Sequence, residues 1–143
     1  MSAPEFSTTA DKGRVLVVDD EMDIREGLET LLSLEGYVVD LAANGTEGLR
    51  KIESRAYDMV LLDLMMPDRS GMDVLREVRG RDRETPIFMI TAYGSVEAAV
   101  EALKLGANDY FSKPWDNEKL LIEIDVQLGE EVLTVLMSEL KIR

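Results

Sequence analysis

Short apolar runs alternate with amphipathic stretches along most of this chain. The first run, Val15 to Val18, is apolar at every position, and further runs cover 38–41, 58–62 and 87–90. A fifth and shorter run covers 109–112. Short runs without regular polar alternation are typical of strands that are covered on both faces of a parallel sheet. The pattern therefore predicts five buried strands.

Amphipathic helices are expected between these strands. Apolar residues at helical spacing after the first strand are Ile24, Leu28, Leu31 and Leu32. Gly36 then stands where a left-handed cap would close that helix. A second helix is expected through Leu49 and Ile52, after a turn at 44–45, and a third from about Gly71 to Gly80. The third helix should bury Met72, Leu75 and Val78.

The helix after the fourth strand has the clearest start signal. Ser95 is the expected N-cap, and Gly106 is expected to close the helix. Val96, Val100 and Leu103 share one side and are expected to form its buried face.

Strand–helix units that repeat in this way predict an α/β fold, a doubly wound five-stranded parallel sheet with helices on both faces. We expect this domain to cover 13–128. Residues 1–12 are expected to be a disordered leader or a cloning remnant, and 129–143 a helical extension or linker.

Polar residues follow the expected strands at one edge of the sheet. Asp19 and Asp20 follow the first strand, Asp63 the third, Thr91 the fourth and Lys113 the fifth. In doubly wound sheets, ligands bind beyond the carboxyl ends of the strands, where the strand order reverses. An ionised carboxylate at the end of a buried strand is costly without a partner. Asp63 is therefore the main candidate for chemistry.

The composition limits that chemistry. The chain has neither histidine nor cysteine, which excludes imidazole and thiolate ligands and nucleophiles. A net charge of -13 argues against direct nucleic-acid binding, which depends on clustered Lys and Arg. No apolar run approaches the roughly 18 to 20 residues of a membrane span, so no membrane contact is expected and the predicted location is the cytoplasm.

Three carboxylates at neighbouring strand ends would repel one another unless a cation is shared among them. Mg²⁺ suits such a set because it binds through one or two carboxylates and bridges to phosphate oxygens. With the hydroxyl of Thr91 and the ammonium of Lys113 nearby, the site would stabilise a phosphoryl group in transit, with Asp63 as the nucleophile.

Four segments with these residues resemble the signature motifs of bacterial two-component response-regulator receiver domains. They are Val17–Glu21, Leu62–Pro67, Ile90–Ala92 and Ser112–Pro114. The resemblance covers about 14–128 and implies a flavodoxin-like strand order of 2-1-3-4-5. It also implies that Asp63 accepts phosphate from a sensor histidine kinase or a histidine phosphotransfer protein.

The resemblance also implies the ligands of a magnesium ion. Asp20, Asp63 and the backbone carbonyl of Met65 would bind Mg²⁺, and Asp19 would act through a metal-bound water.

The remaining site residues also take their roles from the resemblance. Lys113, beside a cis bond to Pro114, would pair with the phosphoryl group, Thr91 would donate a hydrogen bond to it, and Ala92 would keep the site accessible. Tyr110 would swing inward as Thr91 moves, changing the face formed by the fourth helix, fifth strand and fifth helix of the family. A homodimer through that face, with transcription as the output, is expected.

A finer resemblance links 92–100 and 105–110 to the receivers of nitrogen-regulatory, sigma-54-dependent activators. In related receivers, the last helix leads toward an output domain. Here Val132, Val135, Leu136 and Leu140 suggest that it continues and pairs with a second copy. Gly129 interrupts this pattern, so the tail could instead fold back or fray.

Two other functions remain open from the sequence. One is a receiver-like dimerisation module that works without phosphate. The other is an enzyme such as an aspartyl-phosphate hydrolase or a nucleotide-binding protein, although no Gly-rich phosphate loop follows the first strand.

Overall fold

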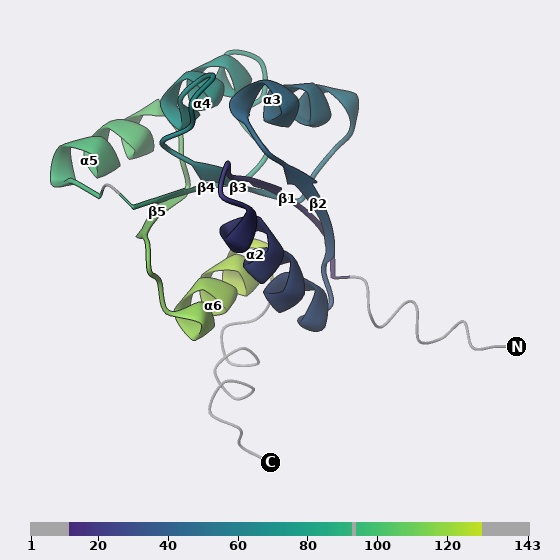
Figure 1. Ribbon diagram of the computed structural model, residues 1–143. Helices are drawn as coiled ribbons and strands as arrows, with labels where there is room; N and C mark the ends of the chain where they lie inside the picture. Colours follow the sequence, from purple (N-terminus) through teal and green to yellow (C-terminus); the bar gives the residue numbers. More distant parts are fainter. Residues whose placement is uncertain (1–11, 93, 130–143) are drawn as a thin grey trace, which may run out of the picture.

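The fold is a single parallel sheet with helices on both faces (Figure 1). The computed structural model describes residues 12–92 and 94–129. Its strands are β1 (Arg14–Val18), β2 (Val38–Ala42), β3 (Met59–Asp63), β4 (Ile87–Thr91) and β5 (Asp109–Ser112). Their order in the sheet is β2-β1-β3-β4-β5, and every pairing is parallel. The predicted fold class and strand order are therefore confirmed.

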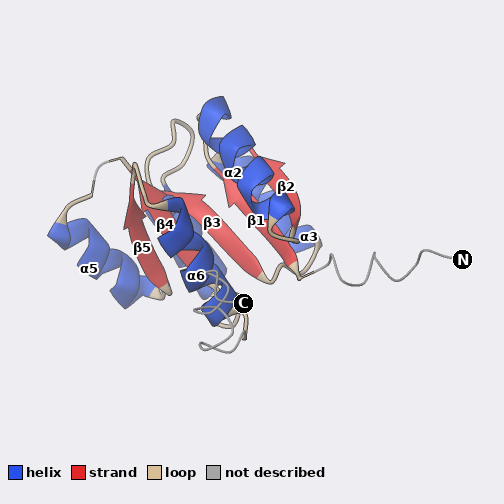
Figure 2. Cartoon of the chain, turned by 90° about the horizontal axis from the view of Figure 1, so that it is seen from below, coloured by secondary structure: helices blue, strands red, loops and turns tan. Residues whose placement is uncertain are grey.

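The helices of the described chain form two layers. They are α2 (Met22–Leu34), α3 (Gly45–Ser54), α4 (Gly71–Arg79), α5 (Val96–Leu105) and α6 (Asn117–Gln127). In Figure 1, α3, α4 and α5 lie above the sheet and α2 and α6 lie below it. Figure 2 shows α2 and α6 crossing that lower face. The sheet is thus covered on both sides.

Alternate residues of the central strands enter two separate cores, as the pleat of a strand requires. In β1, Leu16 and Val18 pack toward α3 and α4, whereas Val15 and Val17 pack toward α2 and α6. All five residues of β3 are buried, and so are all five of β4. This two-sided burial explains why the runs are apolar without alternation.

Side-chain caps start most of the described helices. The capping residues of α3, α4, α5 and α6 are Asn44, Ser70, Ser95 and Asp116, and each accepts backbone N–H bonds from the first turn. Asn44 and Gly45 thus begin a helix, where the sequence predicted a turn. Gly36 closes α2 at a φ of 106°, as predicted. The exception is α2, whose N-cap residue Glu21 makes no side-chain capping bond.

The predicted buried face of α5 is wrong. Val96, Val100 and Leu103 are 78%, 44% and 49% exposed, while Ala102 is completely buried. Ala98 packs against the same core as Ala102. Small alanines therefore make the contact between α5 and the core. The larger residues face outward.

This orientation of α5 predicts unequal effects of two substitutions. Val100→Ala should change the free energy of unfolding by no more than about 0.5 kcal/mol, because the side chain is half exposed. Ala102→Val should cost about 1 to 3 kcal/mol, since the added methyl groups have no space in a packed core. Urea unfolding of both variants measures this, and a larger loss for Val100→Ala would contradict the assigned face.

The ends of the described chain also bear on the predicted domain limits. Lys12, expected in the leader, belongs to the fold: its N–H donates to the carbonyl of Gly36 and its Nζ lies 3.2 Å from Asp125. Residues 1–11 lie outside the described residues, as do residues 130–143 of the helical extension predicted over 129–143. None of the described helices is long and apolar enough to cross a membrane.

Candidate functional site

Three aspartates meet where the carboxyl ends of β1 and β3 lie side by side. Asp19 and Asp20 directly follow β1, and Asp63 is the last residue of β3. One carboxylate oxygen from each lies within 4.8 Å of the others. Asp19 is fully buried and Asp63 is 3% exposed, whereas Asp20 is exposed. The predicted acidic cluster is therefore present, with two buried charges and one facing solvent.

The backbone around Asp19 fixes the orientation of its carboxylate. Its Oδ1 accepts the N–H of Glu21 at 2.8 Å, and its carbonyl accepts a bond from Arg25 at 2.7 Å. Its buried Oδ2 lies 2.9 Å from Lys113 Nζ and has no further hydrogen-bond partner within the described residues. Buried polar atoms are normally satisfied. This oxygen thus has bonding capacity left for a ligand.

Lys113 brings the only ammonium that the described residues place in the cluster. Its Nζ lies 2.9 Å from Asp19 Oδ2, 2.9 Å from Glu21 Oε1 and 3.8 Å from Asp63 Oδ1. Burial by itself lowers the pKa of Lys113, but its bonds to Glu21 and Asp19 outweigh this and raise the pKa. The lysine is therefore a permanent cation between the carboxylates.

Burial and charge repulsion act together on Asp63. Loss of hydration raises its pKa most, and the charge of Asp19 raises it further, to about 7. Lys113 and the N–H of Met65, which donates to Asp63 Oδ1 at 3.3 Å, act in the opposite direction. The pKa of Asp19 is also raised, chiefly by burial. Because both carboxyl groups are hard to ionise in this environment, a bound cation would stabilise their charged forms.

The loop between β3 and α4 is held at both sides. The N–H of Leu64 donates to the carbonyl of Ile90 at 2.9 Å, and the N–H of Gly71 donates to the carbonyl of Leu64 at 2.8 Å. At the loop's other side, the Asp68 carboxylate accepts the N–H groups of Gly45 and Thr46 at 3.0 and 2.9 Å. The loop is therefore anchored to the start of α3.

Asp68 was not identified as a site residue from the sequence. Its only sequence signal is an acidic residue in the loop after Asp63, which does not reveal its partner. Burial tends to raise its pKa, but the bonds from Thr46 and Gly45 lower it well below the ordinary range. The carboxylate thus stays charged and keeps the loop anchored.

A cleft of about 440 Å³ opens over this loop and the cluster. Its lining includes the following residues: Asp20, Glu21, Asp63, Met65, Met66, Pro67, Ala92 and Lys113. Most of the predicted site residues are thus brought together at one surface. Ala92 is exposed and is one of these lining residues.

Three predicted residues are not part of this lining: Tyr110 and the buried Asp19 and Thr91. Thr91 is completely buried at the end of β4, and its carbonyl accepts the N–H of Lys113 at 2.7 Å. Tyr110 is half buried on β5 and packs against the core under α4 and α5. Thr91 therefore supports the backbone of the site, and Tyr110 lies beside the loop that contains Gly94.

The cluster fits a magnesium ion chemically. Its donors are oxygens of three carboxylates that lie within 4.8 Å of one another, two of them buried and one exposed. Mg²⁺ prefers such oxygen ligands and keeps several of its waters, which the open cleft allows. The Lys113–Pro114 peptide bond is cis, as the resemblance implied.

The sequence model of the response regulator receiver domain family matches residues 15–125 of this chain. The chain belongs to the response-regulator receiver family. Over 120 residues this receiver is 45% identical to the transcriptional regulatory protein DltR of Streptococcus agalactiae, an alignment that covers 84% of the chain and 54% of DltR. Over 107 residues it is 42% identical to the regulatory protein AtoC of Escherichia coli, covering 75% of the chain and 23% of AtoC.

A solved structure has the same fold. The CheY-like receiver domain protein of Methanospirillum hungatei is 36% identical, with a TM-score of 0.77, covering 80% of this receiver and 92% of that protein. The predicted resemblance to the receivers of nitrogen-regulatory type regulators is confirmed, with AtoC among the relatives. The chain spans about half the length of DltR and about a quarter of AtoC.

Proposed function

We propose that this receiver is a phosphorylation-driven switch in which Asp63 accepts a phosphoryl group from a histidine of a sensor kinase or phosphotransfer protein. The observation that carries the proposal is the buried carboxylate of Asp63 beside Asp19, Asp20 and Lys113. The carboxylate oxygen forms a bond to phosphorus while the bond from phosphorus to the donor's histidine nitrogen breaks. The neutral histidine then leaves.

The residues of the cluster divide the work of this transfer. Asp20, Asp63 and the carbonyl of Met65 would hold Mg²⁺, and Asp19 would act through a metal-bound water. When bound, the ion supplies positive charge for the phosphoryl oxygens. Lys113 Nζ, 3.8 Å from Asp63 Oδ1, would pair with one of those oxygens. Ala92 would leave room for the donor.

The phosphoryl group would change the conformation through Thr91 and Tyr110. Phosphate adds about -1.5 to -2 charge, which would draw the Thr91 hydroxyl and repack the loop after β4. Tyr110 lies beside that loop, with its Cε1 3.8 Å from the position of a Cβ on Gly94. An inward shift of its ring would alter the surface of α5, β5 and α6 and bias two conformations.

The output would be control of transcription through a second copy or an attached domain. DltR is a transcriptional regulatory protein. Val96, Val100 and Leu103 of α5 are exposed apolar side chains, which supports a homodimer in which α5 takes part. Autophosphorylation and slow loss of its own phosphate would be its only catalysis.

Intact mass after incubation with Mg²⁺ and acetyl phosphate tests this proposal. The native chain should gain one phosphoryl group, Asp63→Asn none, and the exposed control Asp23→Asn one. Size-exclusion chromatography of the same samples should show a dimer only where phosphate is gained. A native chain that takes up no phosphate would contradict the switch and favour a phosphate-independent interaction module.

A further inference from the structure

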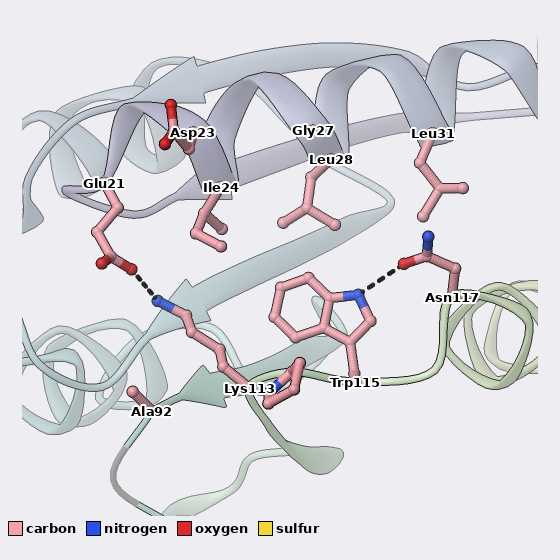
Figure 3. Close-up of a pocket in the computed structure, with 11 residues that line it drawn as sticks. Glu21, Asp23, Ile24, Gly27, Leu28, Leu31, Ala92, Lys113, Trp115 and Asn117 are labelled. Atoms are coloured by element: carbon pink, nitrogen blue, oxygen red, sulfur yellow. Dashed lines mark hydrogen bonds and ion pairs between the residues drawn. The ribbon is translucent and has the colours of Figure 1, made fainter.

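Glu21 occupies an unusual position for a helix N-cap residue. Its backbone N–H is bound by Asp19 Oδ1, and α2 begins at the next residue. N-cap side chains commonly accept a backbone N–H of their own helix, but Glu21 makes no such bond. Its carboxylate instead crosses to Lys113, with Oε1 2.9 Å from Nζ (Figure 3).

This contact decides where the Lys113 ammonium lies. Nζ is equally close to Glu21 and Asp19, at 2.9 Å, and is 3.8 Å from Asp63. Asp63 therefore has the weakest contact with a cation that all three carboxylates attract. If Glu21 did not hold Nζ, the remaining carboxylates within 4 Å in the described chain would be Asp19 and Asp63.

The surroundings leave Lys113 room to move. Its side chain lines both the cleft over Asp63 and a groove of about 510 Å³ between α2 and the start of α6. Glu21 is on the solvent side of this groove, with its side chain 59% exposed. An ion pair of such exposure is weak. It can therefore bias the lysine at rest and still release it to a stronger anion.

We propose that Glu21 is a positioning residue that holds the Lys113 ammonium away from Asp63 in the resting protein, keeping Asp63 free for a divalent cation and for phosphate. Without Glu21 the ammonium lies between Asp19 and Asp63 and competes with the cation for both. The inference rests on the proposed function, since it concerns the same Mg²⁺ and phosphate site.

Mg²⁺ titration of the full chain tests the proposal without any phosphodonor. Trp115 is the only tryptophan, stands two residues after Lys113 and lines the same groove, so its fluorescence reports binding. Three variants are compared with the native chain after circular dichroism confirms their folding. Glu21→Gln removes the charge, Glu21→Asp keeps it on a shorter side chain, and Asp23→Asn removes a nearby charge from the same groove wall.

The expected result is a roughly fivefold weaker Mg²⁺ affinity for both Glu21 variants, in keeping with a weak ion pair, and less than a twofold change for Asp23→Asn. Glu21→Asp is decisive because its charge is intact but it cannot reach Nζ in the same way. Native affinity in Glu21→Asp would overturn the proposal, since charge alone would then explain Glu21→Gln. Equal effects of Glu21→Gln and Asp23→Asn, or no Mg²⁺ response in the native chain, would also overturn it.

The result of the Mg²⁺ titration can be told apart from the result of the phosphorylation test of the proposed function. A native chain that binds Mg²⁺ but takes up no phosphate contradicts the switch and leaves the effect of Glu21 on metal affinity measurable. Uptake of phosphate on Asp63 together with native affinity in both Glu21 variants supports the switch and rejects the positioning role.

Discussion

Asp63→Asn should make the metal-free protein more stable at pH 8 by about 2 to 4 kcal/mol. The carboxyl has a pKa of about 7 in the folded protein, against an ordinary value of 3.8. Below pH 3.8 it is protonated in both states, so its raised pKa has no cost. As the pH rises to 7, the unfolded chain releases the proton first, and the folded state loses stability. Above pH 7 the full cost is present, and Asn removes it.

Urea unfolding in EDTA at pH 4.5 and pH 8 measures this effect. The gain from Asp63→Asn should be small at pH 4.5 and full at pH 8. Asp23→Asn, at an exposed site on α2, should change stability little at either pH. Millimolar Mg²⁺ should reverse the order at pH 8, because a ligand that binds only the folded state stabilises it. If the native chain is as stable as Asp63→Asn in EDTA at pH 8, ionising the buried Asp63 carboxyl does not destabilise the folded protein.

Gly71→Ala should destabilise the protein by about 3 kcal/mol or more. A Cβ at this position would lie 2.2 Å from the carbonyl oxygen of Asp63 and 2.8 Å from the Cα of Leu64. Both are backbone atoms at the end of β3, so no side-chain rotation relieves the clash. The loop must shift, and Asp63 shifts with it. The variant should therefore also bind Mg²⁺ more weakly.

Gly27→Ala is the matched control for that experiment. Gly27 lies within α2, and a Cβ there would have no atom within 4 Å apart from its chain neighbours and the nearby backbone of its own helix. Alanine is the better helix former, so this variant should gain about 0.5 to 1 kcal/mol. The two substitutions are chemically identical and should differ in sign in urea unfolding. A small loss for Gly71→Ala would mean that the loop can move without strain.

Most of the site was predictable because a parallel sheet brings the carboxyl ends of its strands to one edge. Asp19, Asp20, Asp63 and Lys113 each follow a recognisable apolar run, and their proximity needs only the fold class. Their proximity could be predicted even though these residues are far apart along the chain. Glu21 was visible in the same acidic motif, but nothing in the sequence indicated that its side chain leaves the helix terminus and reaches Lys113.

The buried face of α5 shows a second limit of sequence reasoning. Helical spacing identified Val96, Val100 and Leu103 as one stripe, and hydrophobicity assigned it to the core. The structure buries Ala102 instead. The side of a helix that packs inward depends on how closely it approaches the sheet, and small residues permit the closest approach. Periodicity contains no information about that distance.

The amino-acid sequence was sufficient to predict the five strands, their parallel arrangement, the acidic cluster and the family. These follow from local patterns, because the burial of a strand and the start of a helix depend on a few neighbouring residues. The folded chain was needed to show which carboxylates share the Lys113 ammonium, how Asp68 anchors the loop to α3, and which face of α5 is exposed. Those contacts depend on ångström-scale distances between residues far apart in the chain, and such distances are set by the packing of the whole domain.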